Sequence, residues 1–446
     1  MGRLFGTDGI RGIANQYPMT AEMAMKTGKA AARLLCRDND PAKMIVVAKD
    51  TRLSGDMLAS AVCAGICSMG VDVMLADILP TPGVAYLTVS GGAAGGIMIS
   101  ASHNPYTDNG IKIFNNKGHK LSRDLEESLE KMILDNPETS DASNNGHTGR
   151  VFHQQDLHDR YAAFLTDALP LDDNNSLNLV LDCANGATYT VAPRVFAGAY
   201  VLHAAPDGTN INNECGSEHP EALAAEVLAK KADAGFAFDG DGDRVVAVDE
   251  TGMVLSGDRL LALCAKFMKE AGTLAENTVV STVMSNIGLT RALKEMGIAH
   301  VKTDVGDRHV LEKMIACGAA IGGEDSGHMI FTDYQTTGDG MLTALMVCRV
   351  MHRTQKPLSE LAACMTLFPQ TLVNIDVREK PAIESIPAIQ QAITAAETAL
   401  GEAGRVLVRY SGTQAKCRVM VEGPSDEIIQ EHAGTIARAI KETIGK

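Results

Sequence analysis

The segment Asp239-Gly240-Asp241-Gly242-Asp243-Arg244 places three carboxylates at alternating positions, with glycines between them and an arginine behind. Hard divalent cations take several oxygen ligands at about 2.0–2.6 Å, and a tightly turning backbone can direct alternate aspartates at one point. Glycine permits such a turn because it adopts backbone angles that other residues avoid. Residues 234–238 and 245–248, on either side, read as buried strands. We therefore expect a Mg²⁺ site on a loop between strands, and metals held by carboxylates usually serve phosphate chemistry.

Two other interpretations of this loop compete with the magnesium site. One is an acidic surface turn without a ligand. The other is a calcium loop of the EF-hand kind, because Glu250 falls at position 12 when Asp239 is position 1. That loop requires glycine at position 6, where this chain has Arg244, and it requires flanking helices instead of strands. A metal that serves chemistry therefore fits better than a structural Ca²⁺.

A candidate nucleophile lies in Ala101-Ser102-His103-Asn104-Pro105, after a Gly-rich apolar run at residues 91–98 that we expect to be a strand. Ser102 is thus expected on a turn at a strand end, where α/β sheets place their ligands. An ordinary Ser/Asn/Pro turn is the alternative. The chain contains neither G-x-S-x-G nor GxxxxGK[ST], so the patterns of a serine hydrolase and of a P-loop are both absent.

Three further clusters carry groups that suit a sugar phosphate. Gly323-Glu324-Asp325-Ser326-Gly327-His328 offers a carboxylate, a hydroxyl and an imidazole on a tight loop, suited to binding sugar hydroxyls. Arg409-Tyr410-Ser411-Gly412-Thr413, with Arg418 beyond it, offers the cations, hydroxyls and flexible backbone that a phosphate dianion needs. Gly6-Thr7-Asp8-Gly9-Ile10-Arg11-Gly12 is another Gly-rich loop with one cation. Each cluster alone also fits a salt bridge or a buried core residue.

The elements around these loops must bring them together. Apolar runs and helical patterns alternate in the βαβα order typical of largely parallel sheets covered by helices. We expect strands at residues 44–47, 71–76, 177–181 and 278–283, and helices at 55–69, from 81, from 220 and from about 255 to 271. Beyond Phe368-Pro369 we expect strands at 371–377 and 406–408 and helices at 386–400 and 425–444. The expected fold class is α/β, with three similar mixed-sheet α/β domains and a smaller C-terminal α+β domain.

Composition narrows the functional classes. The chain has 446 residues, is 45% hydrophobic and carries a formal net charge of −15, with no compensating basic block, so nucleic acid is not an expected partner. No apolar run reaches the roughly 18 residues of a membrane span, and residues 1–12 do not resemble a signal peptide. The ten cysteines form no CxxC pair, so we expect reduced thiols and a cytoplasmic protein.

In the order and spacing of these motifs, the chain resembles the α-D-phosphohexomutases, and most of all the bacterial phosphoglucosamine mutases. The resemblance covers essentially the whole chain. It is carried by the serine motif at 101–105, the metal loop at 239–244, the sugar loop at 323–328, the phosphate loop at 409–413 with Arg418, and the opening at 5–12. The chain departs from the family pattern at Asp325 and at Gln414-Ala415.

The resemblance implies four domains around a central cleft, each contributing one loop. Their expected limits are 1–152 with the phosphoserine loop, 153–254 with the metal loop, 255–367 with the sugar loop and 368–446 with the phosphate loop. Ser102 would carry a phosphoryl group, and one phosphate oxygen on Ser102 together with Asp239, Asp241 and Asp243 would hold Mg²⁺. The substrate would be bound by Glu324, Ser326, His328, Arg409, Ser411, Gly412, Thr413 and Arg418.

The resemblance also implies an activity, the reversible conversion of glucosamine 6-phosphate to glucosamine 1-phosphate. Phosphoserine would pass its group to the sugar, giving a 1,6-bisphosphate that also serves as activator, and the product would feed UDP-N-acetylglucosamine and the cell wall. Lys112, Arg11 and Arg244 match family positions near the reacting oxygens, and His103 would support them. A lysine acts as general acid or base only when its pKa is lowered, which nearby guanidinium charges favour.

Alternatives to this activity are left open by the sequence. A phosphomannomutase or phosphoglucomutase of the same superfamily is the nearest. A Ca²⁺-binding or sugar-phosphate-sensing protein would use the same carboxylates without turnover, and a metal-dependent phosphatase would release free phosphate. A homodimer remains possible.

Overall fold

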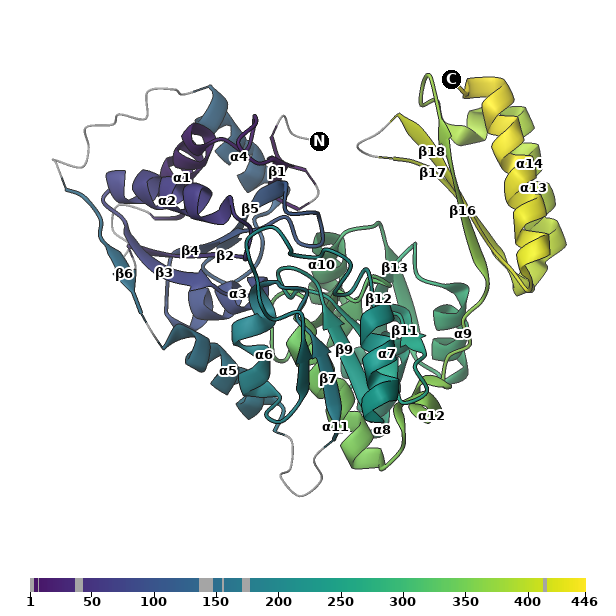
Figure 1. Ribbon diagram of the computed structural model, residues 1–446. Coiled ribbons are helices and arrows are strands. Elements are labelled where there is room, and N and C mark those ends of the chain that lie inside the picture. The colour runs from purple at the N-terminus through teal and green to yellow at the C-terminus, as the bar shows by residue number, and fades with distance from the viewer. Residues whose placement is uncertain are drawn as a thin grey trace. The chain divides into compact units, whose positions relative to one another are not determined.

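The computed structural model describes residues 4–6, 8–36, 43–135, 147–154, 156–170, 177–411 and 415–446. The chain divides into two compact units, each described here by itself (Figure 1). The first unit comprises Met1–Met284 and Ile298–Cys364, and the second comprises Ser285–Gly297 and Met365–Lys446.

The first sheet of the first unit has the strand order β1-β5-β4-β2-β3-β6. Its strands β2, β3, β4 and β6 run parallel, and β5 pairs antiparallel with both β4 and β1. Helices α1, α2 and α4 lie on one side of this sheet and share its main core, and α3 lies on the other side (Figure 1). The elements are β1 (Ile10–Ile13), α1 (Ala21–Leu35), β2 (Met44–Lys49), α2 (Gly55–Ser68), β3 (Asp72–Ile78), α3 (Thr81–Ser90), β4 (Gly95–Ile99), β5 (Asp108–Asn115), α4 (Arg123–Leu134) and β6 (Val151–His153).

The second sheet has the order β11-β10-β9-β7-β8, with β7, β8 and β9 parallel and β10 antiparallel to both β9 and β11. Its strands β7, β9 and β10 are buried along their whole length, as expected for apolar runs in a sheet covered on both faces. The elements are α5 (Leu157–Ala168), β7 (Leu179–Asp182), the 3₁₀ helix η2 (Ala187–Thr190), α6 (Ala192–Val195), β8 (Tyr200–Leu202), α7 (Glu221–Lys230), β9 (Ala234–Phe238), β10 (Val245–Asp249) and β11 (Val254–Leu255).

The third sheet has the order β13-β12-β14-β15, in which only the last pair is antiparallel. Helix α10 packs against β12 and β14 through Val310 and Met314, which share a core with Val280 and Ile330. The elements of this region are α8 (Gly257–Glu270), η3 (Ala275–Asn277), β12 (Thr278–Thr282), β13 (Ala299–Thr303), α10 (Asp307–Cys317), β14 (Ile321–Gly323), β15 (Met329–Phe331), α11 (Gly340–Thr354) and α12 (Leu358–Ala362).

The second unit contains an antiparallel sheet of order β16-β18-β17. Helix α13, helix α14 and the sheet enclose a separate apolar core that includes Val419, Ile389 and Ile436. The elements are α9 (Ile287–Glu295), β16 (Gln370–Asp376), η4 (Ile383–Ser385), α13 (Pro387–Leu400), η5 (Gly401–Ala403), β17 (Arg405–Tyr410), β18 (Lys416–Glu422) and α14 (Asp426–Ile444).

The four motif loops occupy equivalent places in these sheets. The Ser102 loop joins β4 to β5, the aspartate loop joins β9 to β10, and the sugar loop joins β14 to β15. In each case a strand of the parallel set is followed by an antiparallel neighbour, and the motif lies in the connection. The phosphate motif lies between β17 and β18, which are antiparallel as well.

The expected α/β class, with mixed sheets and a smaller C-terminal α+β part, is confirmed. The strand expected at 91–98 begins only at Gly95, because α3 extends to Ser90 and a turn follows it. Strands β1, β5, β6, β8, β11, β13, β14, β15 and β18 were not predicted. Among the described helices, none combines the length and apolar character that crossing a lipid bilayer requires.

Candidate active site

Ser102 lies at the turn after β4 with a left-handed backbone (φ 57°), and only 1% of the residue is exposed. Its Oγ donates a hydrogen bond of 2.6 Å to Oδ2 of Asp239 and lies 3.4 Å from Nδ1 of His103. The serine loop of the first sheet and the aspartate loop of the second therefore meet directly. The function predicted from the sequence requires this contact between the serine loop and the aspartate loop.

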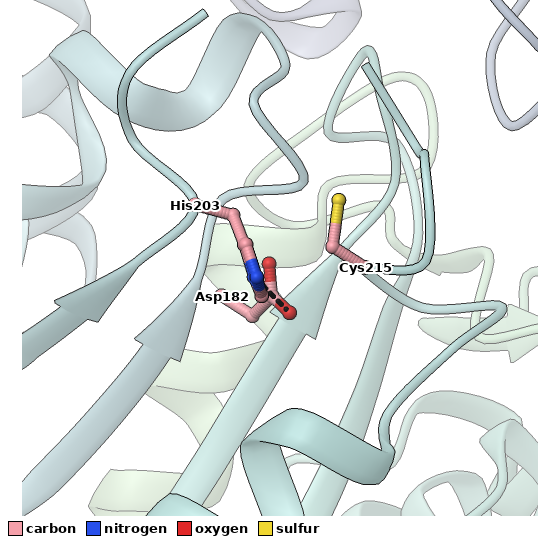
Figure 2. Close-up of side chains that lie close together, drawn as sticks. All are labelled: Asp182, His203 and Cys215. Atoms are coloured by element: carbon pink, nitrogen blue, oxygen red, sulfur yellow. Dashed lines mark ion pairs between the residues drawn. The ribbon is translucent and has the colours of Figure 1, made fainter. Parts of the chain in front are cut away.

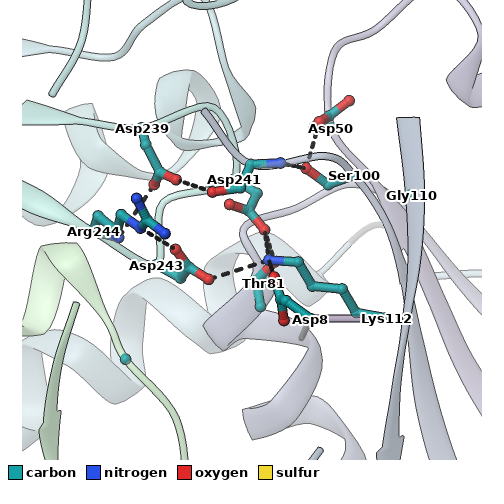
Figure 3. A network of polar contacts seen from close by, with 12 residues as sticks. Asp8, Asp50, Thr81, Ser100, Gly110, Lys112, Asp239, Asp241, Asp243 and Arg244 are labelled. Carbon is teal, nitrogen blue, oxygen red and sulfur yellow. Dashed lines mark hydrogen bonds and ion pairs between the residues drawn. The ribbon is translucent and has the colours of Figure 1, made fainter. Parts of the chain in front are cut away.

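The three aspartates of the metal loop converge as predicted. Asp239, Asp241 and Asp243 are at most 3% exposed, and each offers an oxygen within 4.8 Å of the other two (Figure 3). Oδ1 of Asp241 and Oδ1 of Asp243 are buried without a hydrogen-bond partner in the described part of the chain. Buried carboxylate oxygens without donors are costly, and a hard cation satisfies them. The carboxylate trio therefore fits a divalent metal ion.

Gly240 allows the two loops to approach each other. A Cβ built at this position would lie 2.6 Å from the backbone oxygen of Ser102, closer than a side chain tolerates. On the other side of the loop, Thr81 at the start of α3 donates its backbone N–H to the Asp241 backbone oxygen (2.9 Å) and its hydroxyl to the Asp241 carboxylate. The positive end of the α3 dipole thus faces this carboxylate.

Lys112, on β5, is the main countercharge of the trio. Its Nζ lies 2.7 Å from Asp241, 3.2 Å from Asp243 and 3.2 Å from Asp8, and the residue is 1% exposed. Burial alone would lower the pKa of Lys112, but the three carboxylates outweigh burial and raise its pKa well above the ordinary value. Nearby guanidinium groups were expected to lower it. The structure reverses that expectation, because carboxylates and not arginines surround the ammonium group.

Asp239 has the opposite electrostatic environment. Burial raises its pKa well above the ordinary value, and the neighbouring carboxylates of Asp243 and Asp241 raise it further, against the smaller opposing effects of Arg244 and Ser102. A cation at the trio would oppose this rise in the pKa of Asp239, because its positive charge favours the ionised carboxylate.

The remaining predicted catalytic residues lie around this centre. Arg244 donates its backbone N–H to Asp239 (3.2 Å), and its Nε lies 3.9 Å from Asp243, whose charge raises the arginine's pKa against the effect of burial. His103 has a lowered pKa, first through burial and then through the positive charge of Arg244. Arg11 is partly exposed and pairs with Asp8, so it reaches the site through a carboxylate.

The sugar loop presents its residues in two directions. Glu324 is partly exposed and accepts the backbone N–H of Gly306 (3.0 Å), and Oγ of Ser326 is buried without a hydrogen-bond partner among the described residues. His328 is only 3% exposed, and its Nδ1 lies 3.6 Å from Asp243. Gly338 donates its N–H to Nε2 of the same ring (3.1 Å). The His328 imidazole therefore packs against Asp243 of the metal loop.

The phosphate motif lies in the second unit. Arg409 of β17 and Arg418 of β18 are directly opposite each other in the antiparallel register, which explains their spacing. Nε of Arg418 is buried without a hydrogen-bond partner in the described residues, and Ser411 donates its N–H to the Lys416 oxygen (2.8 Å). Nζ of Lys380 lies 2.6 Å from the Ser411 oxygen. The predicted residues Gly412 and Thr413 lie outside the described part of the chain.

Several residues of the site were not predicted. Lys120 pairs with Asp8 and also with Asp307 (2.6 Å), linking the first sheet to the start of α10. The others are Asp50, Arg52, Thr81, Ser100 and Asn212. The signal for Asp50 and Arg52 was their position immediately after a buried strand, at the sheet edge where ligands gather.

A second cluster that includes metal-binding residue types lies at the ends of β7 and β8 (Figure 2). Nδ1 of His203 is 3.0 Å from Asp182, and Cys215 lies beside them. The Asp182 carboxylate already accepts the backbone N–H groups of Ala184 (2.8 Å) and Gly216 (3.0 Å). Both carboxylate oxygens are therefore used to hold backbone, and the cluster is explained as a support for these loops.

Comparisons with known proteins agree with this geometry. Models described as phosphoglucomutase/phosphomannomutase match as alpha/beta/alpha domain I at residues 2–140, domain II at 159–252, domain III at 256–368 and the C-terminal domain at 372–439.

Curated relatives match along the full length. The phosphoglucosamine mutase of Syntrophus aciditrophicus (strain SB) is 53% identical over 450 residues, covering 100% of both chains, and that of Syntrophobacter fumaroxidans (strain DSM 10017 / MPOB) is 51% identical with the same coverage. Among solved structures, a phosphoglucomutase/phosphomannomutase family protein from Burkholderia thailandensis superposes with a TM-score of 0.79 at 26% identity, over 98% of this chain and 96% of that one. The Aspergillus fumigatus N-acetylphosphoglucosamine mutase in complex with GlcNAc-6P and magnesium (TM-score 0.67, 19% identity, 99% and 96% coverage) shares the fold.

Proposed function

The chain belongs to the phosphoglucomutase/phosphomannomutase family, and from that membership we propose that it interconverts glucosamine 6-phosphate and glucosamine 1-phosphate through a phosphoserine at Ser102. It is a phosphohexomutase, an isomerase that moves a phosphoryl group between two oxygens of a sugar. The choice of hexosamine rests on full-length relatives that are about 50% identical and carry the name phosphoglucosamine mutase.

One observation carries the chemical part of the proposal. The Ser102 hydroxyl lies 2.6 Å from Asp239 and therefore at the edge of the buried carboxylate trio. A phosphoryl group on Ser102 would put its oxygens beside the same trio. A bound divalent cation, for which we propose Mg²⁺, would neutralise negative charge on the transferring group, which is the main requirement of phosphoryl transfer.

The protein's own residues perform the remaining work in this proposal. The phosphorus–Oγ bond of phosphoserine breaks as a free sugar hydroxyl attacks. That hydroxyl loses its proton to a base, and Oγ of Ser102 takes up a proton as it leaves. The other phosphate then returns to Ser102 with the reverse exchange of protons. His103, whose pKa is lowered by burial and by the positive charge of Arg244, has Nδ1 3.4 Å from Oγ, and we propose that it gives a proton to Oγ when the phosphoryl group leaves and takes it back when one returns. Lys112 remains charged and, with Arg244 and Arg11, offsets the negative charge of phosphate.

Binding of the sugar phosphate is assigned by the same proposal to the two outer loops. Glu324 and Ser326 would take the sugar hydroxyls, with His328 holding the loop against Asp243. The non-reacting phosphate would be held by Arg409, Ser411, Gly412, Thr413 and Arg418. The proposal also keeps the four domain ranges given above, a hexosamine 1,6-bisphosphate as activator, a homodimer as a possible assembly, and a cytoplasmic site of action without nucleic acid or membrane as partner.

A direct test uses purified protein with Mg²⁺, a trace of glucosamine 1,6-bisphosphate and glucosamine 6-phosphate. We expect glucosamine 1-phosphate without accumulation of free phosphate, and an intact mass that shows one added phosphoryl group on Ser102. Ser102→Ala should abolish both, whereas Ser128→Ala, a change at a partly exposed serine on α4, should leave both unchanged. Activity that survives in Ser102→Ala would reject the mechanism.

The nearest rival is a preference for mannose or glucose phosphates. Asp325 of the sugar loop is exposed and departs from the pattern of the phosphoglucosamine mutases. Comparing kcat/KM for the 6-phosphates of glucosamine, glucose and mannose decides between them, and the highest value is expected for glucosamine 6-phosphate.

A further inference from the structure

A buried arginine donates hydrogen bonds to the backbone of the Ser102 loop. Arg52 is 2% exposed, and its guanidinium donates to the backbone oxygens of Ser102 (2.8 Å), Asn104 (2.8 Å) and Asp108 (3.0 Å), and also to that of Pro105. One side chain therefore contacts most of the carbonyl groups in the turn between β4 and β5. Charge-assisted hydrogen bonds of this kind are about twice as strong as neutral ones.

Asp50 completes this support on the first sheet. It is fully buried, and its Oδ2 accepts both Nε of Arg52 (2.8 Å) and the hydroxyl of Ser100 (2.6 Å). The Ser100 hydroxyl oxygen in turn accepts the backbone N–H of Ser102 (2.9 Å). The peptide groups on both sides of the Ser102 Cα are thus tied to one ion pair.

A residue of the second sheet's loops reaches the same carbonyl groups. Nδ2 of Asn212 donates to the backbone oxygens of Ser102 (2.9 Å) and Asn104 (3.1 Å), the two oxygens that Nη2 of Arg52 also contacts. Arg52 and Asn212 therefore donate hydrogen bonds to the same two backbone oxygens. Arg52 does so from the first sheet and Asn212 from a loop of the second. No step of the proposed chemistry uses Asn212.

Asn212 is itself fixed by the cluster of Figure 2. Its backbone N–H donates to the Ala184 oxygen (2.9 Å), and Ala184 is held by the Asp182 carboxylate (2.8 Å). Gly216, four residues beyond Asn212, is bound to the same carboxylate. The loop that carries Asn212 is thus rigidly anchored at both ends.

We infer that Asn212 is a positioning residue for phosphoryl transfer, acting with Arg52 to hold Ser102 in the left-handed conformation that aims its Oγ at Asp239. This inference rests on the proposed function and adds to it a link between the two sheets. A left-handed backbone is unfavourable for a non-glycine residue. It persists only when the surroundings enforce it. Without the Asn212 donor, the turn loses two hydrogen bonds to the second sheet, and we expect Oγ of Ser102 to drift from the metal loop.

The test compares matched substitutions at neighbouring asparagines. Asn212→Asp keeps the size of the side chain but places a carboxylate against two carbonyl oxygens, and Asn212→Ala removes the donor. Asn213→Asp and Asn213→Ala make the same changes at an exposed residue next in sequence. We expect kcat to fall about tenfold for Asn212→Ala and further for Asn212→Asp, with KM for the sugar phosphate within about twofold of wild type. The Asn213 variants should match wild type.

A second readout separates this inference from the proposed function. Wild-type protein stripped of its phosphoryl group is mixed with glucosamine 1,6-bisphosphate and Mg²⁺, and loading of Ser102 is followed by intact mass. If wild type does not load, the proposed function fails. If wild type loads and both Asn212 variants load at the wild-type rate, the positioning role is refuted. Should Asn212→Asp fail to fold, Asn212→Ala, which introduces no charge, decides the result.

Discussion

At the scale of single residues, the site is a balance of buried charges. Three buried carboxylates lie close together, and Lys112 contacts two of them. Without a cation the balance is incomplete, because oxygens of Asp241 and Asp243 remain without hydrogen-bond donors in the described residues. Burial and the excess of negative charge together raise the pKa of Asp239.

Magnesium binding should therefore depend on pH. A protonated Asp239 cannot bind the cation, so we expect the Kd for Mg²⁺ to rise as the pH falls from about 8 to about 5, with protons released on binding. The direction in which stability changes with pH follows from the raised pKa of Asp239. The ionised form of Asp239 costs folding free energy above that pKa, so Mg²⁺ should raise Tm more at the higher pH. Calorimetric titration in two buffers of different ionisation enthalpy measures the Kd for Mg²⁺ and the number of protons released. An equal Kd at both pH values without proton release would contradict the prediction.

Residue types and spacing were enough to predict that the three aspartates converge and that Ser102 lies on a turn after a strand, but not which residues surround them. Asp239, Asp241 and Asp243 are close in sequence, and their alternation already implies convergence. The partners of Ser102 are Arg52 and Asn212, about 50 and 110 positions away, and only tertiary packing brings them there. The pKa direction of Lys112 was wrong for the same reason, because its carboxylate neighbours come from other loops.

At the scale of elements, each motif sits in the connection between antiparallel strands. Such connections are short, and their ends are fixed by strand pairing, so side chains on them are placed more accurately than on long loops. A backbone hydrogen bond joins the loops of the second and third sheets. Val245 at the start of β10 donates its N–H to the Gly327 oxygen of the sugar loop (3.2 Å), so the metal loop and the sugar loop are directly joined.

Gly327→Ala should disturb the sugar loop selectively. Gly327 has φ 86°, and a Cβ there would overlap the Val245 carbonyl oxygen. We expect a rise of about tenfold or more in KM for the sugar phosphate, together with a loss of about 1–3 kcal/mol in stability. Gly252→Ala is the matched control, because Gly252 has φ 84° but faces only the flexible Leu228 side chain. Equal KM values for the two variants would sink the prediction.

Asp339, the N-cap of α11, should give the stability a second pH dependence. Burial raises its pKa to about 6, and it accepts hydrogen bonds from Leu342 N–H (3.0 Å) and the Tyr161 hydroxyl (2.7 Å). The stabilising contribution of a raised carboxyl pKa is complete below the unfolded value of about 3.9 and is lost as the pH rises through about 6.

Asp339→Asn keeps the acceptor for the Leu342 N–H, places an amide NH₂ beside the Tyr161 hydroxyl, which can turn to accept it, and removes this titration. Relative to the variant, wild type should lose about 1.4 kcal/mol of unfolding free energy between pH 5 and pH 8, the part of its total of roughly 3 kcal/mol that is not already lost below pH 5. Urea unfolding at the two pH values measures the difference. Asp333→Asn, a change at an exposed residue nearby, should leave the wild-type pH dependence unchanged, and identical curves for Asp339→Asn and wild type would refute the assignment.

The pattern of apolar runs was enough to predict the sheet-and-helix alternation but not every strand. β14 has only three residues, Ile321–Gly323, too few to show a periodicity. β18 begins with Lys416 and Arg418 around one buried cysteine, so its first half looks polar. His328 was expected to bind the substrate, and a buried core position was the alternative that the sequence left open. The residue is 3% exposed and its Nδ1 lies 3.6 Å from Asp243, and its role toward the substrate stays a prediction.

At the scale of the whole molecule, the chain forms two units with separate cores. The core of the second unit contains Ile436, and the main core of the first contains Leu58, and both residues are fully buried. Separate cores can unfold in separate cooperative steps. The carboxylate trio belongs entirely to the first unit.

Calorimetry should therefore resolve two unfolding transitions, with Mg²⁺ raising only one of them. Leu58→Ala should lower the Mg²⁺-sensitive transition and Ile436→Ala the other, each by about 2–5 kcal/mol of unfolding free energy. A single transition that both substitutions shift equally would show that the units unfold together.

All three acidic ligands of the ion come from one stretch of six residues, 239–244, within a single connection of the second sheet. If the proposed cation is bound there, none of these ligands has to leave when the sugar phosphate is released, so the ion can stay on the protein between turnovers. An inhibitor could then be built to reach a metal ion held by a single loop, and an anionic oxygen group is the chemical class that would coordinate it.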